Sequence, residues 1–463
     1  MQWTIQEYLD SLKGKRVAVL GIGVSNTPLI KMLLGAGISV TACDKREAPD
    51  SQMEELANLG AKLQLGAGYL DNLMGFDVIF RTPGMRPDLP QLTAAVEGGS
   101  ELTSEMEVFF RVCPCPIIGV TGSDGKTTTT TIIAQLLQAA GRTVFLGGNI
   151  GTPLLPEVSR MKAGDVAVVE LSSFQLMTMT QSPHIAVVTN LAPNHLDVHK
   201  SMEEYIVSKE NIFTHQSAGD RVILNADNDI TRAFAASVPG QVTLFSRQQE
   251  PEGSAVFLRD NVIWVRDERG ERAVLPREGI LLPGDHNVEN YMAAIGAVNG
   301  LVSDEVIRAF AAQFGGVEHR IELVRTLNGV RYYNDSIASS PTRTMAGLKC
   351  FPEKVILIAG GYDKHIPFDE LGPAIVEHVK RLILTGDTST KIREAVEAAP
   401  DYQKDAPVIE EYQDFRTAVE AAHRAAEKDD VVILSPACAS FDHFKNFMER
   451  GECFKKIVRE WDT

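Results

Sequence analysis

Short apolar runs alternate with segments of helical periodicity along the first part of the chain. Residues 16–20, 38–43 and 76–80 have the pattern of buried strands, and apolar residues recur at helical spacing over 27–34. Parallel strands need a crossover connection, which is usually a helix, so this order predicts half of a doubly wound parallel sheet. We therefore expect a Rossmann-like N-terminal domain over residues 1–112.

The same alternation resumes after Pro114-Cys115-Pro116, which we interpret as a linker. Helical segments separate predicted strands at residues 117–120, 143–146, 166–169, 185–188 and 222–224. This order predicts a mostly parallel sheet. We expect a central domain over residues 113–316 with the architecture of P-loop ATPases.

The segment from 242 to 282 has a different pattern. Its short alternating strands are broken by turn signals such as Arg259-Asp260-Asn261, which predicts an antiparallel flap on the central domain. Two helices are predicted after it, over 287–299 and 304–314.

The last part of the chain begins at Gly315-Gly316, which we interpret as a hinge. Asn328-Gly329 is a strong hairpin signal between strands predicted at 322–325 and 330–333. Further strands, predicted at residues 354–359, 381–384 and 431–434, alternate with helices. We expect a second Rossmann-like domain over 317–463, which makes the chain an α/β protein of three domains.

The composition of the chain argues against several kinds of binding partner. The chain has 463 residues, a formal net charge of −16 and a pI near 5.2, which argues against binding to nucleic acid or to a membrane surface. No apolar run approaches the ~18 residues of a membrane span, and the first residues lack the order of a signal peptide. The cysteines are scattered without metal-ligand spacing. We expect a cytoplasmic protein with free thiols.

The segment 122–128, Gly-Ser-Asp-Gly-Lys-Thr-Thr, lies between a predicted strand and a predicted helix. Glycines allow backbone N–H groups to turn toward phosphate oxygens, and the helix N-terminus adds its positive dipole end. Lys126 would reach the outer phosphates of a nucleotide and Thr127 would bind a magnesium ion. Val120 stands where the strict phosphate-loop pattern has glycine, so a tight turn with a surface lysine is the alternative.

Other polar residues follow predicted strands. Glu170 ends an apolar strand, where an acid can hold magnesium, although it could be a solvated strand end. His195 lies at the carboxyl edge of the sheet, where open α/β folds bind ligands, and could hold a metal or a substrate oxygen. Lys209 lies on a predicted helix, where a lysine is most often a solvated surface charge.

The first domain contains Gly21-Ile22-Gly23, but Asn26 stands where a dinucleotide fingerprint has its third glycine. A nicotinamide or flavin site, a different nucleotide-bearing ligand and a structural turn remain open. Asp44 follows the second predicted strand, where an acid can contact a sugar or a base edge.

Five motifs in this order and spacing resemble the Mur ligases, the ATP-dependent amide-forming enzymes of peptidoglycan synthesis. They are the loop 122–128, the segment 190–195, Gly284-Asp285-His286-Asn287, Glu318-His319-Arg320 and the run 434–440. The run 434–440, with the segment 441–447, is similar to the members that add D-glutamate. The resemblance covers essentially the whole chain.

The resemblance implies a ligase that adds D-glutamate to UDP-N-acetylmuramoyl-L-alanine through an acyl phosphate and releases ADP and phosphate. That reaction belongs to cell-wall biogenesis and so bears on cell shape and division. Three alternatives remain. One is another Mur-type or folylpolyglutamate-type amide ligase with a different acceptor. Another is a nucleotide-regulated binding protein without turnover. The third is an enzyme of hydride transfer that binds NAD at Gly21-Ile22-Gly23.

For the nucleotide and metal sites, the resemblance implies ATP and two Mg²⁺ ions. The ATP-binding residues would be Gly122, Ser123, Asp124, Gly125, Lys126, Thr127, Thr128, Asn287, Asn290, Arg320 and Asp335. The catalytic residues would be Lys126, Glu170, His195 and Lys209. Thr127 and Glu170 would hold one metal; His195 and Lys209, if the lysine is carbamylated, would hold the other.

For the two other substrates, the resemblance places a UDP-sugar on the first domain. Its contacts would be Val24, Ser25, Asp44, Arg46, Thr82, Pro83, Gly84, Asn149 and His195. D-glutamate would be held by Ser339, Lys364, Ser440, Phe441 and Phe447. Phe441 and Phe447 could instead be core residues. The resemblance also leads us to expect a monomer.

Overall fold

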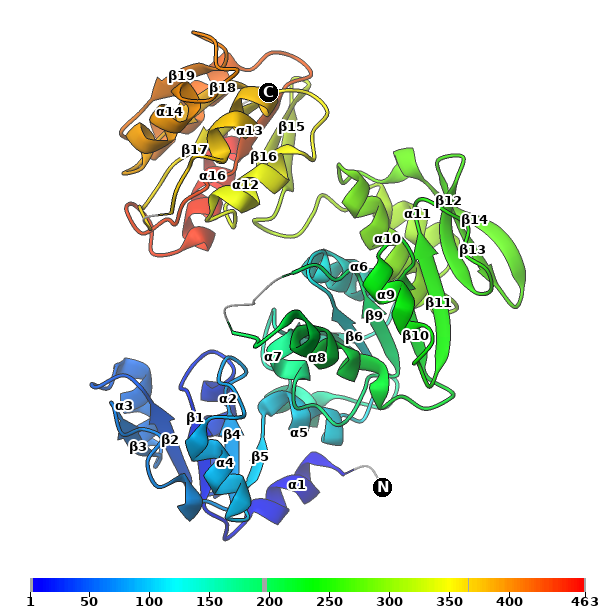
Figure 1. Cartoon of the computed structure of the whole chain (residues 1–463), viewed down its shortest axis with the longest axis vertical. Coiled ribbons are helices and arrows are strands. Elements are labelled where there is room, and N and C mark those ends of the chain that lie inside the picture. The colour runs from blue at the N-terminus through cyan, green and yellow to red at the C-terminus, as the bar shows by residue number, and fades with distance from the viewer. Residues whose placement is uncertain (1–2, 194–197, 365, 462–463) are drawn as a thin grey trace. The chain divides into compact units, whose positions relative to one another are not determined.

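The structure is a computed structural model that describes residues 3–193, 198–364 and 366–461. Its first sheet has five parallel strands in the order β3-β2-β1-β4-β5 (Figure 1). They are β1 (Val17–Leu20), β2 (Val40–Asp44), β3 (Lys62–Leu65), β4 (Val78–Arg81) and β5 (Glu101–Thr103). The predicted Rossmann-like sheet is confirmed. The strand order reverses at β1 and β4, so their carboxyl ends mark the ligand-binding edge.

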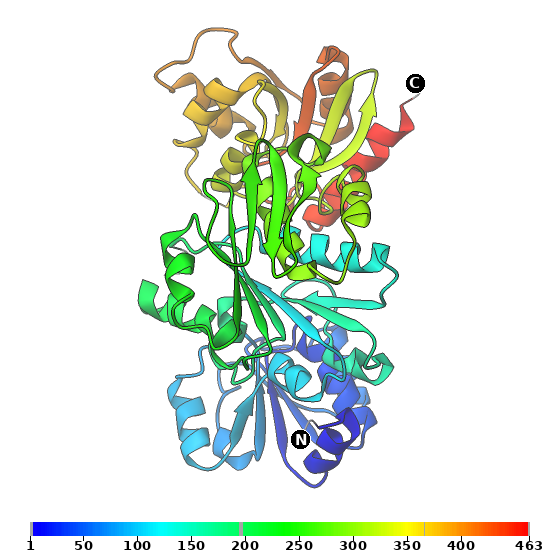
Figure 2. The same cartoon turned by 90° about the vertical axis from the view of Figure 1, so that its right-hand side faces the viewer.

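Helices cover both faces of this first sheet (Figure 2). They are α1 (Ile5–Leu12), α2 (Asn26–Gly35), α3 (Ser51–Asn58), the 3-10 turn η1 (Leu73–Gly75), α4 (Pro90–Glu97) and α5 (Glu105–Val112). Val17 and Val19 of β1 share a core cluster with α2 and α3, whereas Ala18 and Leu20 share one with α4 and η1. Successive strand residues point to opposite faces, which explains why the whole of β1 is apolar.

The central sheet has nine strands in the order β14-β13-β12-β11-β10-β9-β6-β8-β7. Its strands are β6 (Ile117–Thr121), β7 (Val144–Gly148), β8 (Val166–Glu170), β9 (Ile185–Val188), β10 (Arg221–Asn225), β11 (Gln241–Ser246), β12 (Ala255–Arg259), β13 (Val262–Asp267) and β14 (Gly270–Pro276). The strands from β7 to β12 pair in parallel, which confirms the predicted parallel sheet.

The helices of this segment are α6 (Lys126–Ala139), η2 (Leu155–Arg160), α7 (Ser173–Leu176), α8 (Met202–Thr214), α9 (Asp229–Phe234), η3 (Arg277–Gly279), α10 (Asp285–Val298) and α11 (Asp304–Ala311). Residues of α7, α8 and α9 share a core cluster with alternate residues of β8, β9 and β10. β6 lies between β9 and β8 in this sheet and runs directly into the loop before α6.

The predicted antiparallel flap over 242–282 is wrong in its first half. β11 pairs in parallel with β10, and β12 pairs in parallel with β11; antiparallel pairing is found from β12 to β14. The reason is that α9 crosses over between β10 and β11, which makes β11 part of the parallel sheet. The turn signal was sound, since Asp260 and Asn261 have φ values of +50° and +57° between β12 and β13.

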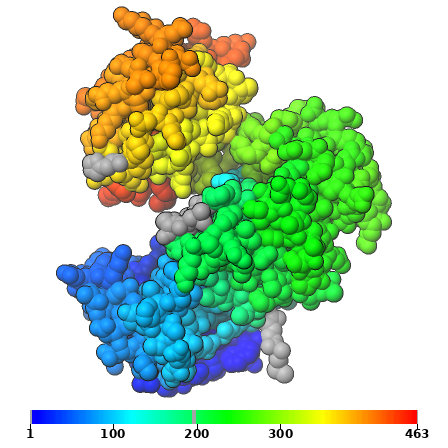
Figure 3. Space-filling view, viewed as in Figure 1, coloured from blue at the N-terminus to red at the C-terminus, as the bar shows by residue number. Residues whose placement is uncertain are grey.

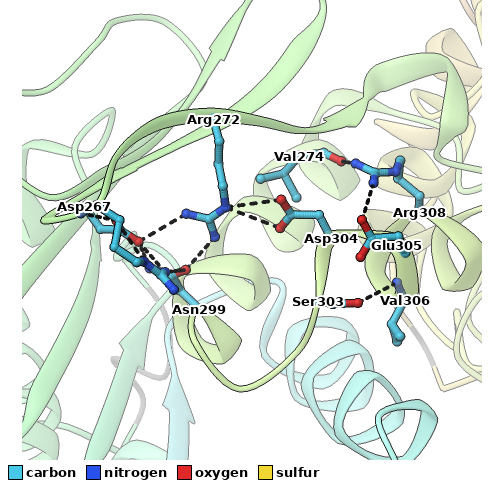
Figure 4. A network of polar contacts seen from close by, with 10 residues as sticks. Asp267, Arg272, Val274, Asn299, Ser303, Asp304, Glu305, Val306 and Arg308 are labelled. Atoms are coloured by element: carbon cyan, nitrogen blue, oxygen red, sulfur yellow. Dashed lines mark hydrogen bonds and ion pairs between the residues drawn. The ribbon is translucent and has the colours of Figure 1, made fainter.

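A polar network ties β14 to the end of α10 and the start of α11 (Figure 4). Arg272 donates to Asp304 Oδ2 at 3.2 Å, to Asp267 Oδ2 at 3.1 Å and to Asn299 Oδ1 at 2.7 Å. The guanidinium thus connects β14 to β13, to the residue after α10 and to α11, which fixes the antiparallel strands against the helices that follow them.

The third sheet has six strands in the order β15-β16-β20-β17-β18-β19. They are β15 (Glu322–Leu327), β16 (Val330–Asn334), β17 (Val355–Ala359), β18 (Val379–Leu384), β19 (Val408–Glu411) and β20 (Val431–Leu434). The predicted hairpin between β15 and β16 is confirmed, with φ of +52° at Asn328 and +83° at Gly329. The other pairs are parallel.

Helices again lie on both faces of the third sheet. They are α12 (Pro341–Leu348), α13 (Leu371–His378), α14 (Ser389–Glu397), α15 (Phe415–Ala425) and α16 (Phe447–Glu460). Leu357 and Ile433 share a core cluster with α12, α13 and α14, whereas Ile358 and Leu434 share one with α15 and α16. The predicted second Rossmann-like sheet is confirmed, with its antiparallel edge strand β15.

The chain forms two compact units. The first contains residues 1–279 and 288–310, and the second contains 280–287 and 311–463. The first two sheets therefore lie in one unit, drawn from blue to green in Figure 3, and the third sheet lies in the other.

Candidate active site

The loop between β6 and α6 needs glycine at two positions. Gly122 has a φ of +149° and Gly125 one of +76°. A Cβ on Gly122 would stand 1.9 Å from Thr189 Oγ1, and a Cβ on Gly125 would stand 2.3 Å from Asn290 Oδ1. Lys126 is the first residue of α6, so the loop ends at a helix N-terminus suited to an anion. The predicted strand–loop–helix order is confirmed.

Hydrogen bonds hold this glycine loop in place. The amides of Ser123 and Asp124 donate to the backbone and side-chain oxygens of Asn190, both at 2.9 Å. Lys126 Nζ donates to the carbonyls of Gly122 at 3.0 Å and Ser123 at 2.9 Å. The lysine is therefore folded over its own loop, and Thr128 behind it is buried.

A carboxylate and a hydroxyl meet beside the first turn of α6. Thr127 Oγ1 donates to Glu170 Oε2 at 2.8 Å, and Asn149 Nδ2 donates to Glu170 Oε1 at 2.8 Å. Glu170 is only 1% exposed, so it is not a solvated strand end. Oxygen atoms of this kind are the ligands that Mg²⁺ prefers.

Lys209 lies inside the protein, contrary to the surface position that helical lysines usually have. It is 1% exposed, and its Nζ donates to Thr121 Oγ1 at 3.0 Å and to the Gly122 carbonyl at 2.9 Å. Burial, and then repulsion from Lys126, hold the pKa of Lys209 well below its usual value, while Glu170 opposes the shift. A buried lysine of this kind is a reactive amine.

The segment after β9 closes the other side of the loop. Ser123 Oγ donates to the carbonyl of Ala192 at 2.9 Å and forms a hydrogen bond with Tyr205 Oη at 2.9 Å. His195, the predicted metal and substrate ligand, lies outside the described residues, as does Asn194.

In the first sheet, Asp44 and Arg46 connect the end of β2 to the glycine turn after β1. Asp44 accepts from the Ile22 amide at 2.8 Å and from Arg46 Nε at 2.9 Å, and Arg46 also donates to the Ile22 carbonyl at 2.7 Å. Val24 is 80% exposed and Ser25 precedes α2. The predicted UDP-binding residues of this segment thus gather at one sheet edge.

The Asp44 carboxylate should make the unfolding free energy of the protein depend on pH in the acid range. Burial alone would raise the pKa of Asp44, but the hydrogen bonds from Arg46 and Ile22 lower it to about 2. The folded pKa lies below the unfolded value of about 3.9, so the stabilisation is complete above pH ~4 and is lost as pH falls toward 2. We expect Asp44→Asn to remove about 2 kcal/mol of unfolding free energy near neutral pH. Denaturation curves measured between pH 2 and 7 test this prediction. If the wild type and Asp44→Asn lost stability in parallel as the pH fell, the prediction would be wrong.

The predicted UDP-binding residues Thr82, Pro83 and Gly84 form a turn that follows β4 at the same edge. The Thr82 amide donates to the Leu20 carbonyl at 3.1 Å, which anchors the turn to the end of β1. A Cβ on Gly21 would stand 3.1 Å from Thr82 Cγ2, so the glycine turn and the Thr82 turn are in close contact.

The remaining predicted nucleotide residues divide between the units. Asn290 lies in the first unit, where its Oδ1 accepts from Thr129 Oγ1 at 3.2 Å. Asn287, Arg320 and Asp335 lie in the second. Asn287 Nδ2 donates to the Pro283 carbonyl at 2.7 Å, and Arg320 is half-buried.

Asp335 is buried, with 4% of its surface exposed. It accepts from Ser435 Oγ at 2.8 Å, and burial raises the pKa of Asp335 to about 7 despite that bond and the nearby Arg320. His319 is a packed imidazole, 5% exposed, with Nδ1 2.9 Å from Asn334 Nδ2.

The predicted D-glutamate residues lie on three segments of the second unit. Ser440 is buried after β20, while Ser339 is half-buried and Lys364 is exposed. Phe441 is 59% exposed, with its ring 5.8 Å from that of Tyr362, and is therefore not a core residue. Phe447 is half-buried at the start of α16.

Sequence reasoning missed two residues that shape these segments. The Tyr205 ring lies 5.0 Å from Lys209 Nζ, and its spacing of four residues on α8 was a signal for that contact. Arg450 is 3% exposed and donates to the carbonyls of Ser336, Cys438 and Ala439, each at 3.0 Å. An arginine within a helix gave no signal of that role.

Comparison with known proteins decides the family. Models of three Mur ligase domains match the chain: the MurD-like N-terminal domain at residues 15–104, the middle domain at 120–298 and the glutamate ligase domain at 319–438. The chain belongs to the Mur ligase family. The predicted resemblance and the three-part α/β fold are thereby confirmed.

Related proteins match this Mur ligase along essentially its whole length. Proteins named UDP-N-acetylmuramoylalanine--D-glutamate ligase are 55% identical in Acetivibrio thermocellus, over 99% of both chains, and 50% identical in Ruminiclostridium cellulolyticum, over 98% of both. Among solved structures, UDP-N-acetylmuramate-alanine ligase of Thermotoga maritima superimposes with a TM-score of 0.57 at 16% identity, over 96% of this chain and 99% of the other. That likeness supports the fold.

In the part of the chain that the structure describes, no helix of this Mur ligase combines the length and apolar character that crossing a membrane requires.

Proposed function

We propose that this Mur ligase joins D-glutamate to UDP-N-acetylmuramoyl-L-alanine in peptidoglycan synthesis, driven by ATP. Relatives that are 48–55% identical over essentially the whole chain carry the name of that activity. The structural observation that carries the proposal is the cluster of Lys126, Thr127, Glu170 and buried Lys209 around one glycine loop.

The chemistry requires activation of a carboxylate, because its oxygen is a poor leaving group. The L-alanyl carboxylate attacks the γ-phosphorus of ATP, forming an acyl phosphate and releasing ADP. The amine of D-glutamate then attacks the acyl carbon, loses a proton and displaces phosphate. Each step gathers anions, so catalysis rests on positioning and on neutralising charge. Lys126 at the N-terminus of α6 supplies a cation where the γ-phosphate would lie.

The residues present fit magnesium. Thr127 and Glu170 already place a hydroxyl and a carboxylate oxygen 2.8 Å apart, and Lys209 of α8 donates to the Gly122 carbonyl of the glycine loop. We assign Thr127 and Glu170 to one ion, and His195 with Lys209 to a second. Magnesium, when bound, neutralises phosphate charge. Lys209 would serve as a ligand after its neutral amine adds to CO₂ and loses a proton, which yields a carbamate; burial favours the neutral amine this reaction needs.

The other parts of the chain supply the remaining substrates. Val24, Ser25, Asp44, Arg46 and the turn Thr82-Pro83-Gly84 would bind the UDP group, with Asn149 near the reacting end. Ser339, Lys364, Ser440, Phe441 and Phe447 would bind D-glutamate. We assign domain boundaries at 112/113 and 316/317, and propose a cytoplasmic monomer.

The proposal is tested by the acceptor amino acid. Purified protein with ATP, Mg²⁺ and UDP-N-acetylmuramoyl-L-alanine should release phosphate when D-glutamate is added and yield a product heavier by one glutamyl residue. L-alanine, L-glutamate and a diamino acid are the matched comparisons, and omission of the UDP precursor controls for simple ATP hydrolysis. A product formed with a different acceptor, or none at all, would contradict the proposal.

A further inference from the structure

Arg81 is a buried arginine at the end of a strand, a position where arginine side chains are usually exposed. It is the last residue of β4 and only 1% exposed, and it directly precedes the turn Thr82-Pro83-Gly84. Arginine is rarely buried to this extent without several partners, because its charge and its N–H groups must be compensated.

The guanidinium contacts two domains at once. Its Nη1 donates to the carbonyls of Pro83 at 3.1 Å and Met85 at 2.9 Å, both in the turn after β4. Its Nη2 donates to the Phe174 carbonyl at 3.1 Å and to Thr178 Oγ1 at 2.8 Å, both in the central part of the chain. One rigid planar group therefore fixes the distance between the turn and the segment around α7.

The charge of Arg81 is compensated from a third element. Glu107 on α5 is 9% exposed and exerts an attractive electrostatic effect on Arg81. Burial raises the pKa of Glu107, and the neighbouring Ser104, Arg81 and Thr178 oppose that rise. A buried cation and a buried anion thus attract one another electrostatically where α5 leads from the first sheet to the second.

The two segments that Arg81 joins lie beside different parts of the proposed active site. On one side is the turn that would hold the UDP group. On the other, α7 begins directly after Glu170-Leu171-Ser172, with Ser172 as its N-cap. Glu170 is the carboxylate that accepts from Thr127 at the glycine loop. Arg81 is therefore connected through short, packed segments to both sites.

We propose that Arg81 is a positioning residue that sets where the carboxylate of the UDP-linked substrate arrives relative to the glycine loop. Thr178 is its partner on the central side. The inference rests on the proposed function, since it concerns the geometry of that reaction. Arg81 touches no reacting atom; it acts through the turn 82–84 on one side and through α7 on the other.

Two substitutions separate the two sides of the connection. Arg81→Lys leaves one ammonium in place of four directed bonds, so both the turn and α7 lose support. Thr178→Val removes the hydroxyl but leaves the bonds from Arg81 to Pro83 and Met85, and Thr178→Ser restores the hydroxyl. The matched control is Lys200→Met, which removes a solvent-exposed ion pair between Lys200 and Asp88 of the same two domains.

We expect Arg81→Lys to raise KM for UDP-N-acetylmuramoyl-L-alanine and lower kcat, with a combined loss in kcat/KM of about 100-fold. KM values for ATP and D-glutamate should stay within about twofold. Thr178→Val should lower kcat by about tenfold with KM for the UDP precursor nearly unchanged, because the turn keeps its anchor. Thr178→Ser and Lys200→Met should match the wild type.

Calorimetry of UDP-precursor binding without ATP measures the contribution of the turn alone. Arg81→Lys should weaken this binding and Thr178→Val should not. Wild-type kinetics in both variants, or loss of melting temperature without a change in kcat or KM, would overturn the positioning role. If Arg81→Lys fails to fold, Thr178→Val alone decides. A wild-type protein that forms no D-glutamate product would overturn the proposed function, and this role with it.

Discussion

Replacing Lys209 by methionine should abolish most turnover while making the folded protein more stable. Turnover should fall by roughly 100- to 1,000-fold, because the side chain that we assign to the second metal is removed from the reacting phosphates. Stability should rise by about 1 kcal/mol or more, because the folded state no longer encloses an amine whose charged form is disfavoured by burial and by Lys126. Steady-state phosphate release and urea denaturation in CO₂-free buffer would measure the two effects.

The matched control for Lys209 is its neighbour Ser208. The Ser208 hydroxyl donates to the Glu204 carbonyl within α8 at 2.7 Å, and Ser208 is also buried. We expect Ser208→Ala to retain turnover. Lys209→Ala, which leaves a vacancy, should regain part of its activity with formate or acetate, whose carboxylate can replace that of a carbamate. Full activity in Lys209→Ala without any addition would show that this lysine holds no metal.

Periodicity was enough to predict the three sheets, because their strands are buried on both faces. Val17–Leu20, Ile185–Val188 and Val431–Leu434 are uniformly apolar runs, and each was predicted within one residue at its ends. The strands that were missed, β3 (Lys62–Leu65), β5 (Glu101–Thr103) and β19 (Val408–Glu411), lie at sheet edges, where half-exposed polar side chains dilute the signal.

Connectivity was harder to predict than strand positions. The sequence over 242–282 showed strands and turns correctly, but local patterns do not reveal whether a strand pairs in parallel. β11 joined the parallel sheet because α9 precedes it, and β12 followed in parallel through a connection without a helix. Pairing of this kind is decided by tertiary contacts.

The candidate site was predictable where chemistry depends on consecutive residues. The glycine loop, Lys126 and Thr127 form such a segment, and the steric contacts at Gly122 and Gly125 now explain why its glycines are needed. Burial of Lys209 and of Arg81 could not be predicted, because it is produced by elements distant in sequence. A helix lysine and a strand-end arginine look like surface charges until the fold encloses them.

The second large effect is expected at Lys126. Its ammonium lies on the first turn of α6 and donates to two loop carbonyls, Gly122 and Ser123. Nucleotide phosphates are stronger acceptors than carbonyls, so we expect the lysine to exchange these bonds for charge-assisted ones when ATP binds. Lys126→Met should then lose about 1,000-fold in turnover. Lys126 is the one cationic residue of α6, so its replacement leaves this helix with no cation to offset the charge on the transferred phosphoryl group.

The loss at Lys126 should be specific to phosphoryl transfer rather than to folding. Thr130, one turn further along α6, is fully buried and donates to the Lys126 carbonyl at 2.8 Å, so Thr130→Val perturbs the same helix without touching the loop. We expect Thr130→Val to keep most turnover. Lys126→Met should still bind the UDP precursor with wild-type affinity, since the first sheet is unchanged. Equal loss of ADP formation in both variants would show that the helix, and not its ammonium, carries the effect.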